Sequence, residues 1–216
     1  MKYLLKIKYK INYKLYRYIS KILEFGNNID RNRIFSESAF IESSVRLLPT
    51  AKVENLANNP NLIYIGDNSV IRGKLLVFAH CGKIQIGKDC YVGEDTRIWS
   101  ADSIKIGDRV FISHNVNVHD TNSHSTDATL RYHHFLAIMS TGHPEANDYD
   151  IESEPILIED DVWIGFNSTI LKGVKIGKGS IVAACSVVTK NVPEFVIVAG
   201  NPAKVVKELK ISGNST

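Results

Sequence analysis

The run His119-Asp120-Thr121-Asn122-Ser123-His124 places two imidazoles and a carboxylate close together. Imidazole titrates near neutral pH, so it is the side chain best suited to act as a general base that takes a proton from a substrate. His119 and His124 are therefore both candidate general bases, and Asp120 is expected to orient one of the rings or to hold the acceptor. Since no cysteine or serine is paired with a base in a recognisable motif, we expect no covalent intermediate on the protein.

These residues follow a long repeat in which an aliphatic residue recurs every six positions. The repeat runs through Ile41, Leu47 and Val53, Ile65, Ile71 and Val77, Ile86, Val92 and Ile98, Ile106, Ile112 and Val118, and Ile158, Ile164, Ile170, Ile176, Val182 and Val188. A period of six fits neither a helix nor an isolated strand. It predicts an all-β solenoid in which three six-residue units make a coil of about 18 residues, with coils about 4.8 Å apart. The aliphatic residues are expected to fill its interior.

Two segments interrupt or end this repeat. Residues 120–157 have no six-residue periodicity and contain four histidines, which predicts a long functional loop without regular structure. Residues 202–210 begin with a proline after a Gly-Asn turn, which predicts a short C-terminal helix. We therefore divide the chain into an N-terminal helix over residues 1–25, a solenoid domain over 26–201 that includes the loop, and a C-terminal helix and tail over 202–216.

Residues 1–25 are strongly basic, with a net charge of +6, whereas the whole chain of 216 residues carries +3. Their lysines and aliphatic residues fall on separate stripes at helical spacing, which predicts a basic amphipathic helix. Such a helix either lies on an anionic membrane surface or packs on a partner subunit or on the end of the solenoid. The remainder of the chain is mildly acidic, which argues against nucleic acid as a partner. We predict a cytoplasmic protein that binds reversibly to the inner face of the membrane.

The cysteines indicate neither a disulfide framework nor a metal site. Cys81, Cys90 and Cys185 are odd in number and include no CxxC pair. They are expected to be buried thiols in a reducing compartment. Lysines interrupt every apolar stretch near the N-terminus, so no signal peptide is expected, and no apolar run is long enough for a transmembrane helix.

The segment from Val162 to Lys207 contains the runs WIG, GVKIG, SVVTKNVP and GNPAK. It resembles the C-terminal signature of the hexapeptide-repeat acyltransferases, and the resemblance covers roughly residues 40–208. It implies a left-handed parallel β-helix, acetyl-CoA as co-substrate without a metal, and a homotrimer. The HD-x-x-x-H run and the long loop are similar to those of acetyltransferases for bacterial lipopolysaccharide, capsule and exopolysaccharide. That similarity implies O-acetylation of a sugar in a surface polysaccharide or its precursor.

The same resemblance implies roles for individual residues. Thr121, His124 and Arg131 match the family's run of threonine and catalytic histidine followed by an arginine, so His124 is implied as the base, with His119 as its rival, and Arg131 as an acceptor contact. The residues that match the coenzyme A groove and the positions near its phosphates are Trp163, Gly165, Ala184, Thr189, Lys190, Lys204 and Lys207. The family's usual Gly-Ala-Gly-Ser is replaced by Ala183-Ala184-Cys185-Ser186, which adds bulk beside the donor path.

Three other functions remain open. An N-acetyltransferase for an amino sugar is disfavoured because such enzymes often carry a nucleotide-binding GxGxxG unit, which is missing near residue 1. A γ-class carbonic anhydrase would use the H-x4-H pair His119 and His124 with His80 as zinc ligands, but the GNPAK run belongs to acyltransferases. A non-catalytic scaffold on the same fold is the third alternative.

Overall fold

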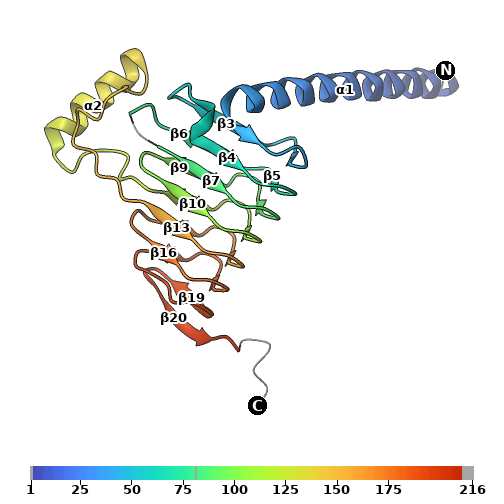
Figure 1. The fold of residues 1–216 in the computed structure, drawn as a ribbon. Coiled ribbons are helices and arrows are strands. Elements are labelled where there is room, and N and C mark those ends of the chain that lie inside the picture. The colour runs from blue at the N-terminus through green and yellow to red at the C-terminus, as the bar shows by residue number, and fades with distance from the viewer. Residues whose placement is uncertain (1, 81, 211–216) are drawn as a thin grey trace.

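The computed structural model describes residues 2–80 and 82–210, with side chains from residue 12 onward. In this part of the chain, short strands wind into a β-helix with three sheets, called A, B and C here (Figure 1). Sheet A contains β1 (Phe40–Ile41), β4 (Ile63–Ile65), β7 (Ile84–Ile86), β10 (Ile104–Ile106), β13 (Ile156–Ile158) and β16 (Lys175–Ile176). Sheet B contains β2 (Arg46–Leu47), β5 (Val70–Ile71), β8 (Tyr91–Val92), β11 (Phe111–Ile112), β14 (Trp163–Ile164), β17 (Ile181–Val182), β19 (Val196–Gly200) and β20 (Ala203–Glu208). Sheet C contains β3 (Lys52–Asn55), β6 (Lys74–Val77), β9 (Arg97–Ser100), β12 (Asn117–His119), β15 (Thr169–Ile170) and β18 (Val187–Val188).

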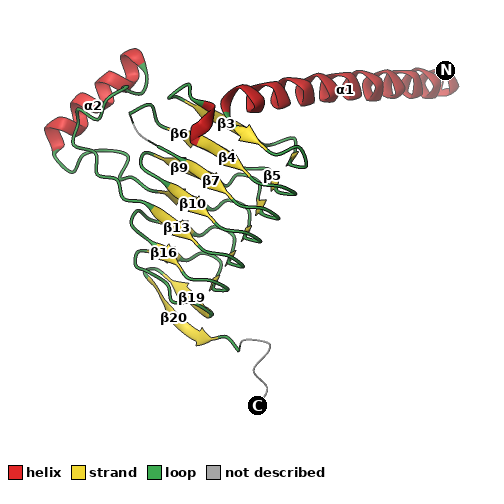
Figure 2. Cartoon of the chain, in the orientation of Figure 1, coloured by secondary structure: helices red, strands yellow, loops and turns green. Residues whose placement is uncertain are grey.

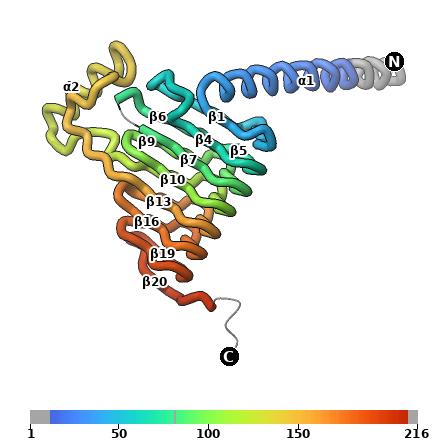
Figure 3. Tube along the Cα trace, in the orientation of Figure 1, coloured from blue at the N-terminus to red at the C-terminus, as the bar shows by residue number. Residues whose placement is uncertain are grey.

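The six-residue repeat produces this architecture directly. Consecutive coils pair in parallel and in register, so that Ile104 lies between Ile84 of the coil before and Ile156 of the coil after. The repeating aliphatic side chains point inward, and most of them are fully buried, as Ile164 and Ile170 are. The predicted solenoid is confirmed, and Figure 3 shows its stacked coils. The left-handed winding stays a prediction.

The corners between strands share a backbone conformation. Asparagine and aspartate residues such as Asn68, Asp95 and Asn167 adopt positive φ there, a conformation that these two residue types tolerate better than most. At Gly165 a Cβ atom would lie 2.5 Å from the backbone nitrogen of Ala184 on the next coil, so no side chain fits. The close stacking of coils therefore explains this glycine of the WIG run.

A long helix precedes the first coil. α1 spans Lys2–Ser38, so the predicted helix over residues 1–25 continues well past its expected end. Its C-terminal turn is anchored by Phe35, which is buried against the first coils, while the rest of the helix extends away from the β-helix (Figures 1 and 2). Between Tyr13 and Ile34 many large apolar side chains are exposed. No helix in the described ranges combines the length and apolar character needed to cross a membrane.

The segment 120–157 leaves the β-helix after β12 and returns at β13. It is not without regular structure, because it contains α2 (Ala128–Thr141), which Asp127 caps by accepting hydrogen bonds from the amides of Thr129 and Leu130. The ends of the segment are held together: the amide of Asn122 donates to the carbonyl of Glu152 at 3.0 Å. The insertion is therefore a loop whose two ends are hydrogen-bonded to each other and which contains a helix. In the view of Figure 2, α2 lies on the side opposite α1.

The predicted C-terminal helix is wrong. β20 forms an antiparallel pair with β19 instead, with Gly200 opposite Ala203 across the turn. The last coil leaves an open sheet edge, and the β-branched pair Val205-Val206 suits a strand that pairs with it. Residues 211–216 of the predicted tail lie outside the described residues.

The cysteines differ in environment. Cys90 is buried, and this burial raises the pKa of its thiol to about 11, so it is an inert thiol as predicted. Cys185 is exposed at a corner with φ of 60°, so the prediction that it is buried is wrong. Cys81 lies outside the described residues.

Candidate active site

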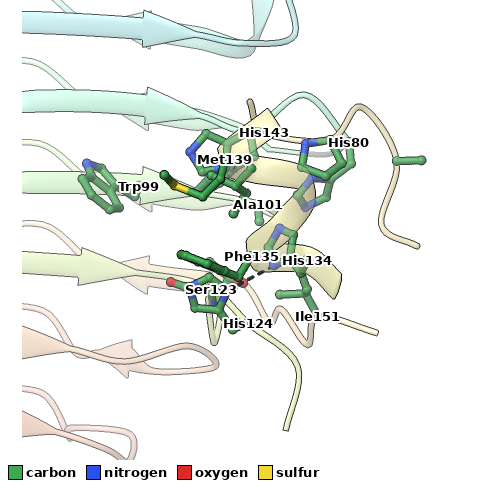
Figure 4. A pocket seen from close by; sticks show the side chains of 15 residues that line it. His80, Trp99, Ala101, Ser123, His124, His134, Phe135, Met139, His143 and Ile151 are labelled. Carbon is green, nitrogen blue, oxygen red and sulfur yellow. Dashed lines mark hydrogen bonds between the residues drawn. The ribbon is translucent and has the colours of Figure 1, made fainter. Parts of the chain in front are cut away.

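A cavity of about 300 Å³ lies where β12 passes into the insertion (Figure 4). The coils and α2 supply apolar walls, and four histidines face the same space. The lining residues are Phe78, His80, Trp99, Ala101, Thr121, Ser123, His124, His134, Phe135, Ile138, Met139, His143, Pro144, Ala146 and Ile151. No aspartate, glutamate, lysine or arginine is among them, so histidine is the only titratable side chain that the described residues contribute to the cavity wall.

His124 is paired with a second histidine that the sequence analysis did not single out. Its Nδ1 lies 3.1 Å from Nδ1 of His134, a residue of α2 that is only 4% exposed. The His134 ring stacks on Tyr149 with centroids 4.9 Å apart. Burial lowers the pKa of His134, and repulsion from the neighbouring histidines lowers it further, so His134 is neutral at neutral pH. The sequence held no signal for this pair, because only the placement of α2 brings the rings together.

His119 lies outside the cavity wall, on the outer face of sheet C. It is in register with Trp99 on the coil before, and the two rings stack with centroids 4.8 Å apart. Burial, assisted by the charge of Arg97, lowers the pKa of His119 to about 4. Its Nε2 is buried, with no hydrogen-bond partner among the described residues. The structure thus separates the two candidate bases: only His124 lines the cavity.

Asp120 does not take either of its predicted roles. Its carboxylate is fully buried and accepts hydrogen bonds from the hydroxyl of Ser100 at 2.6 Å and from the amides of Ala101 and Asp102 at 2.7 and 3.1 Å. Burial raises the pKa of this carboxyl group, and the three hydrogen bonds oppose that effect. These bonds tie β12 to the preceding coil, so Asp120 neither orients an imidazole nor reaches an acceptor. It fixes the point where the insertion leaves the β-helix.

Arg131 lies in the first turns of α2. One of its guanidinium nitrogens donates to the carbonyls of Ser125 and Thr126, both at 3.0 Å. These bonds hold the loop that directly follows His124. Arg131 does not itself line the cavity, and part of its hydrogen-bonding capacity is used on the backbone, so its role as an acceptor contact stays a prediction.

The predicted donor residues fall on two separate parts of the β-helix. Trp163 is 51% exposed on β14, and Gly165 and Ala184 lie at the corners that follow β14 and β17 in sheet B. Lys204 and Lys207 are exposed on β20, in the same sheet. One chain therefore brings these five residues to sheet B and its corners, away from the end of β12 in sheet C.

Thr189 and Lys190 follow β18 in sheet C, which also contains β12. Thr189 lines a second depression together with Thr121 and Lys172. Because Thr121 lines the His124 cavity as well, the depression and the cavity adjoin each other. These two donor positions thus lie on the same edge as the candidate base.

The three histidines proposed as zinc ligands in a carbonic anhydrase do not line one common site. His80 and His124 line the cavity, whereas His119 is stacked on Trp99 outside its wall. In the described ranges no group of three or more His, Cys, Asp or Glu side chains is arranged to hold a metal ion.

Two family models match the repeat. The model described as "Bacterial transferase hexapeptide (six repeats)" matches residues 155–190, and "Hexapeptide repeat of succinyl-transferase" matches residues 83–119. This chain carries the hexapeptide repeat of bacterial transferases. The two matched segments belong to coils on either side of the insertion, so the insertion itself is outside both models.

Curated relatives share parts of the sequence. A 2,3,4,5-tetrahydropyridine-2,6-dicarboxylate N-acetyltransferase of Clostridium perfringens is 64% identical over 55 residues, which are 26% of this chain and 23% of that protein. The putative acetyltransferase YJL218W of Saccharomyces cerevisiae is 35% identical over 126 residues, which are 53% of this chain and 60% of that protein. The chain thus spans less than two thirds of the length of these relatives.

Solved structures share the fold. AntD, an N-acyltransferase from Bacillus cereus in complex with dTDP-4-amino-4,6-dideoxyglucose and coenzyme A, has a TM-score of 0.63 and 21% identity, covering 83% of this chain and 89% of that one. The polySia-specific acetyltransferase NeuO has a TM-score of 0.59 and 24% identity, covering 82% of this chain and 70% of that one. At these identities the likeness is one of fold. Together with the repeat, it supports the predicted β-helix fold.

Proposed function

We propose that this chain is an acetyl-CoA-dependent O-acetyltransferase that modifies a sugar of a bacterial surface polysaccharide or its precursor. The observation that carries the proposal is the position of His124. Its ring faces an apolar cavity large enough for part of a sugar, and Thr121 joins that cavity to the depression lined by Thr189. A base, an acceptor chamber and a path for the acyl donor therefore adjoin one another on this edge.

The proposed reaction is a single transfer. Nε2 of His124 takes the proton of the acceptor hydroxyl while its oxygen attacks the carbonyl carbon of the acetyl thioester. A carbon–oxygen bond forms, the carbon–sulfur bond breaks, and coenzyme A leaves as a thiolate that receives the proton from His124. Phe135 and Met139 of α2 supply part of the apolar wall beside the reacting atoms.

The donor residues on sheet B imply a second copy of the chain. Tyr91, Phe111, Trp163 and Ile181 lie in register on neighbouring coils and form an outward ladder on this sheet. Phe111 and Trp163 are each more than half exposed in the single chain, which is typical of a surface that a partner covers. We propose a homotrimer in which this ladder meets the His124 edge of the next subunit. Trp163, Gly165, Ala184, Lys204 and Lys207 would then complete the coenzyme A groove, the lysines contacting its phosphates.

α1 supports a proposal about location. Most of the helix extends away from the β-helix (Figure 1), and its described part presents a row of exposed apolar side chains at spacings of three and four residues. Those side chains are Leu15, Tyr18, Ile22, Phe25 and Ile29. Residues 1–25 add a net charge of +6. We propose that α1 lies on the anionic inner face of the membrane, where lipid-linked glycans are assembled, with the β-helix in the cytoplasm.

N-acetylation of an amino sugar is the second candidate, favoured by the Clostridium perfringens relative and by AntD, both of which act on nitrogen according to their names. One experiment addresses both candidates. Acetyl-CoA is incubated with a panel of hydroxyl and amino sugars, nucleotide-linked sugars and glycans, and release of free thiol is followed. Treating the purified product with alkaline hydroxylamine removes an O-acetyl ester and leaves an N-acetyl amide. A hydroxylamine-labile product supports the proposal, and a resistant one favours N-transfer.

A further inference from the structure

We propose that His134 is a positioning residue that keeps His124 in the tautomer able to accept a proton at Nε2. The inference rests on the proposed function, in which His124 is the general base. It starts from a contact between two side chains that are ten residues apart and that belong to different elements. His124 follows β12, and His134 lies on α2.

The contact allows only two arrangements of protons. The Nδ1 atoms of His124 and His134 are 3.1 Å apart, so one of them donates a hydrogen bond and the other accepts it. If His134 donates, a neutral His124 carries its proton on Nε2 and has no lone pair free toward the cavity. If His124 donates, its Nε2 is unprotonated and acts as the base. The partner of Nδ1 thus decides whether the ring can catalyse.

The surroundings of His134 favour a neutral ring that accepts a hydrogen bond over a protonated ring. The ring is 4% exposed and stacked on Tyr149, and the cationic forms of His80, His124 and His143 would all repel a proton on it. His134 therefore stays neutral when His124 takes up the substrate proton. The protonated His124 must donate from both nitrogens, and Nδ1 of a neutral His134 accepts one of these bonds. This is the arrangement that needs no tautomer change during turnover.

The insertion fixes the position of His134. Asp127 caps the start of α2, and Arg131 holds the preceding loop through the carbonyls of Ser125 and Thr126. The helix thereby forms part of the cavity wall and supplies the orienting group in one element. The insertion thus contributes to catalysis by holding His134 against His124.

Steady-state kinetics of three variants test the proposal. His134→Phe keeps an aromatic ring beside Tyr149 but removes the acceptor, and we expect it to lower kcat about 10- to 100-fold with an unchanged KM for acetyl-CoA. His134→Asn places Oδ1 close to the position of Nδ1, and it should retain most of the activity. His133→Phe removes the neighbouring exposed histidine of α2 and serves as the control with normal kinetics. Equal loss in the Phe and Asn variants, or a change in KM alone, would overturn the proposal.

The tautomer itself is measured by 15N solid-state NMR of the full chain with 15N-labelled histidine. We expect His124 to carry its proton on Nδ1 in the wild-type protein and in His134→Asn, and on Nε2 in His134→Phe. The His124 signals are assigned by their absence in His124→Ala. An Nε2 proton on His124 in the wild type refutes the role of His134 whatever the activity of the variants. Failure of the proposed function is distinguishable, because it would appear as full thioester turnover by His124→Ala.

Discussion

The buried imidazole of His119 makes a quantitative prediction about stability and pH. The folded protein lowers the pKa of His119 to about 4 from an ordinary value of 6.5, because the ring is buried and lies near the charge of Arg97. The unfolded chain therefore binds a proton at a higher pH than the folded chain, so stability falls as the pH falls between 6.5 and 4. From pH 7 to pH 5 this one group costs about 2 kcal/mol of unfolding free energy.

The perturbation that isolates this effect is His119→Phe, which keeps a flat ring against Trp99 and removes both the titration and the unpaired buried Nε2. Urea unfolding of the wild type and of the variant is measured at pH 7 and pH 5 at one protein concentration. We expect the wild type to lose about 2 kcal/mol more than His119→Phe over this range. His80 and His134 titrate in both proteins, so they cancel in the comparison. The same pH dependence in both proteins would show that His119 is not held neutral by burial.

Three further predictions follow from other contacts. Asp120→Ala removes the acceptor of the buried Ala101 amide and of the part-buried Asp102 amide, while the Ser100 hydroxyl keeps its bonds to Lys83, so it should reduce the unfolding free energy by about 2 kcal/mol or more, measured by urea unfolding, whereas Asp102→Ala serves as a near-neutral control. Phe111→Asp puts a charge into the sheet B ladder and should give an inactive monomer by light scattering, and an active monomer would contradict the shared site. Deleting residues 1–25 should abolish sedimentation with anionic vesicles and preserve activity on a soluble acceptor. Equal binding by both forms, or by neither at low salt, would leave α1 with a packing role only.

The β-helix could be predicted because the same short sequence pattern occurs in every coil. Each six-residue unit places an aliphatic residue toward the interior, and the parallel register follows once coils stack. The C-terminal segment shows the opposite case. Its Pro202 is a valid signal for a helix start, but the open edge left by β19 decides the outcome, and that edge is known only once the coils are built.

The candidate site was predicted in part. The sequence indicated His124, and the structure places it in a cavity. Asp127 is a typical helix-capping residue and could have indicated α2, but the lack of a six-residue period led to the prediction of a loop without regular structure. Asp120 and His134 could not be assigned from the sequence. The hydrogen bonds of Asp120 reach back to the previous coil, and the contact of His134 depends on how the insertion folds over the end of β12. Both are consequences of tertiary placement.

The central claim is that His124 is the base, and the direct test is turnover of acetyl-CoA with a competent acceptor, followed by thiol release, for His124→Ala beside His119→Ala. We expect His124→Ala to lose about 100-fold or more in kcat while still binding acetyl-CoA, and His119→Ala to remain active. Near-normal turnover by His124→Ala together with loss of activity in His119→Ala would contradict the account and assign the base to the imidazole stacked on Trp99.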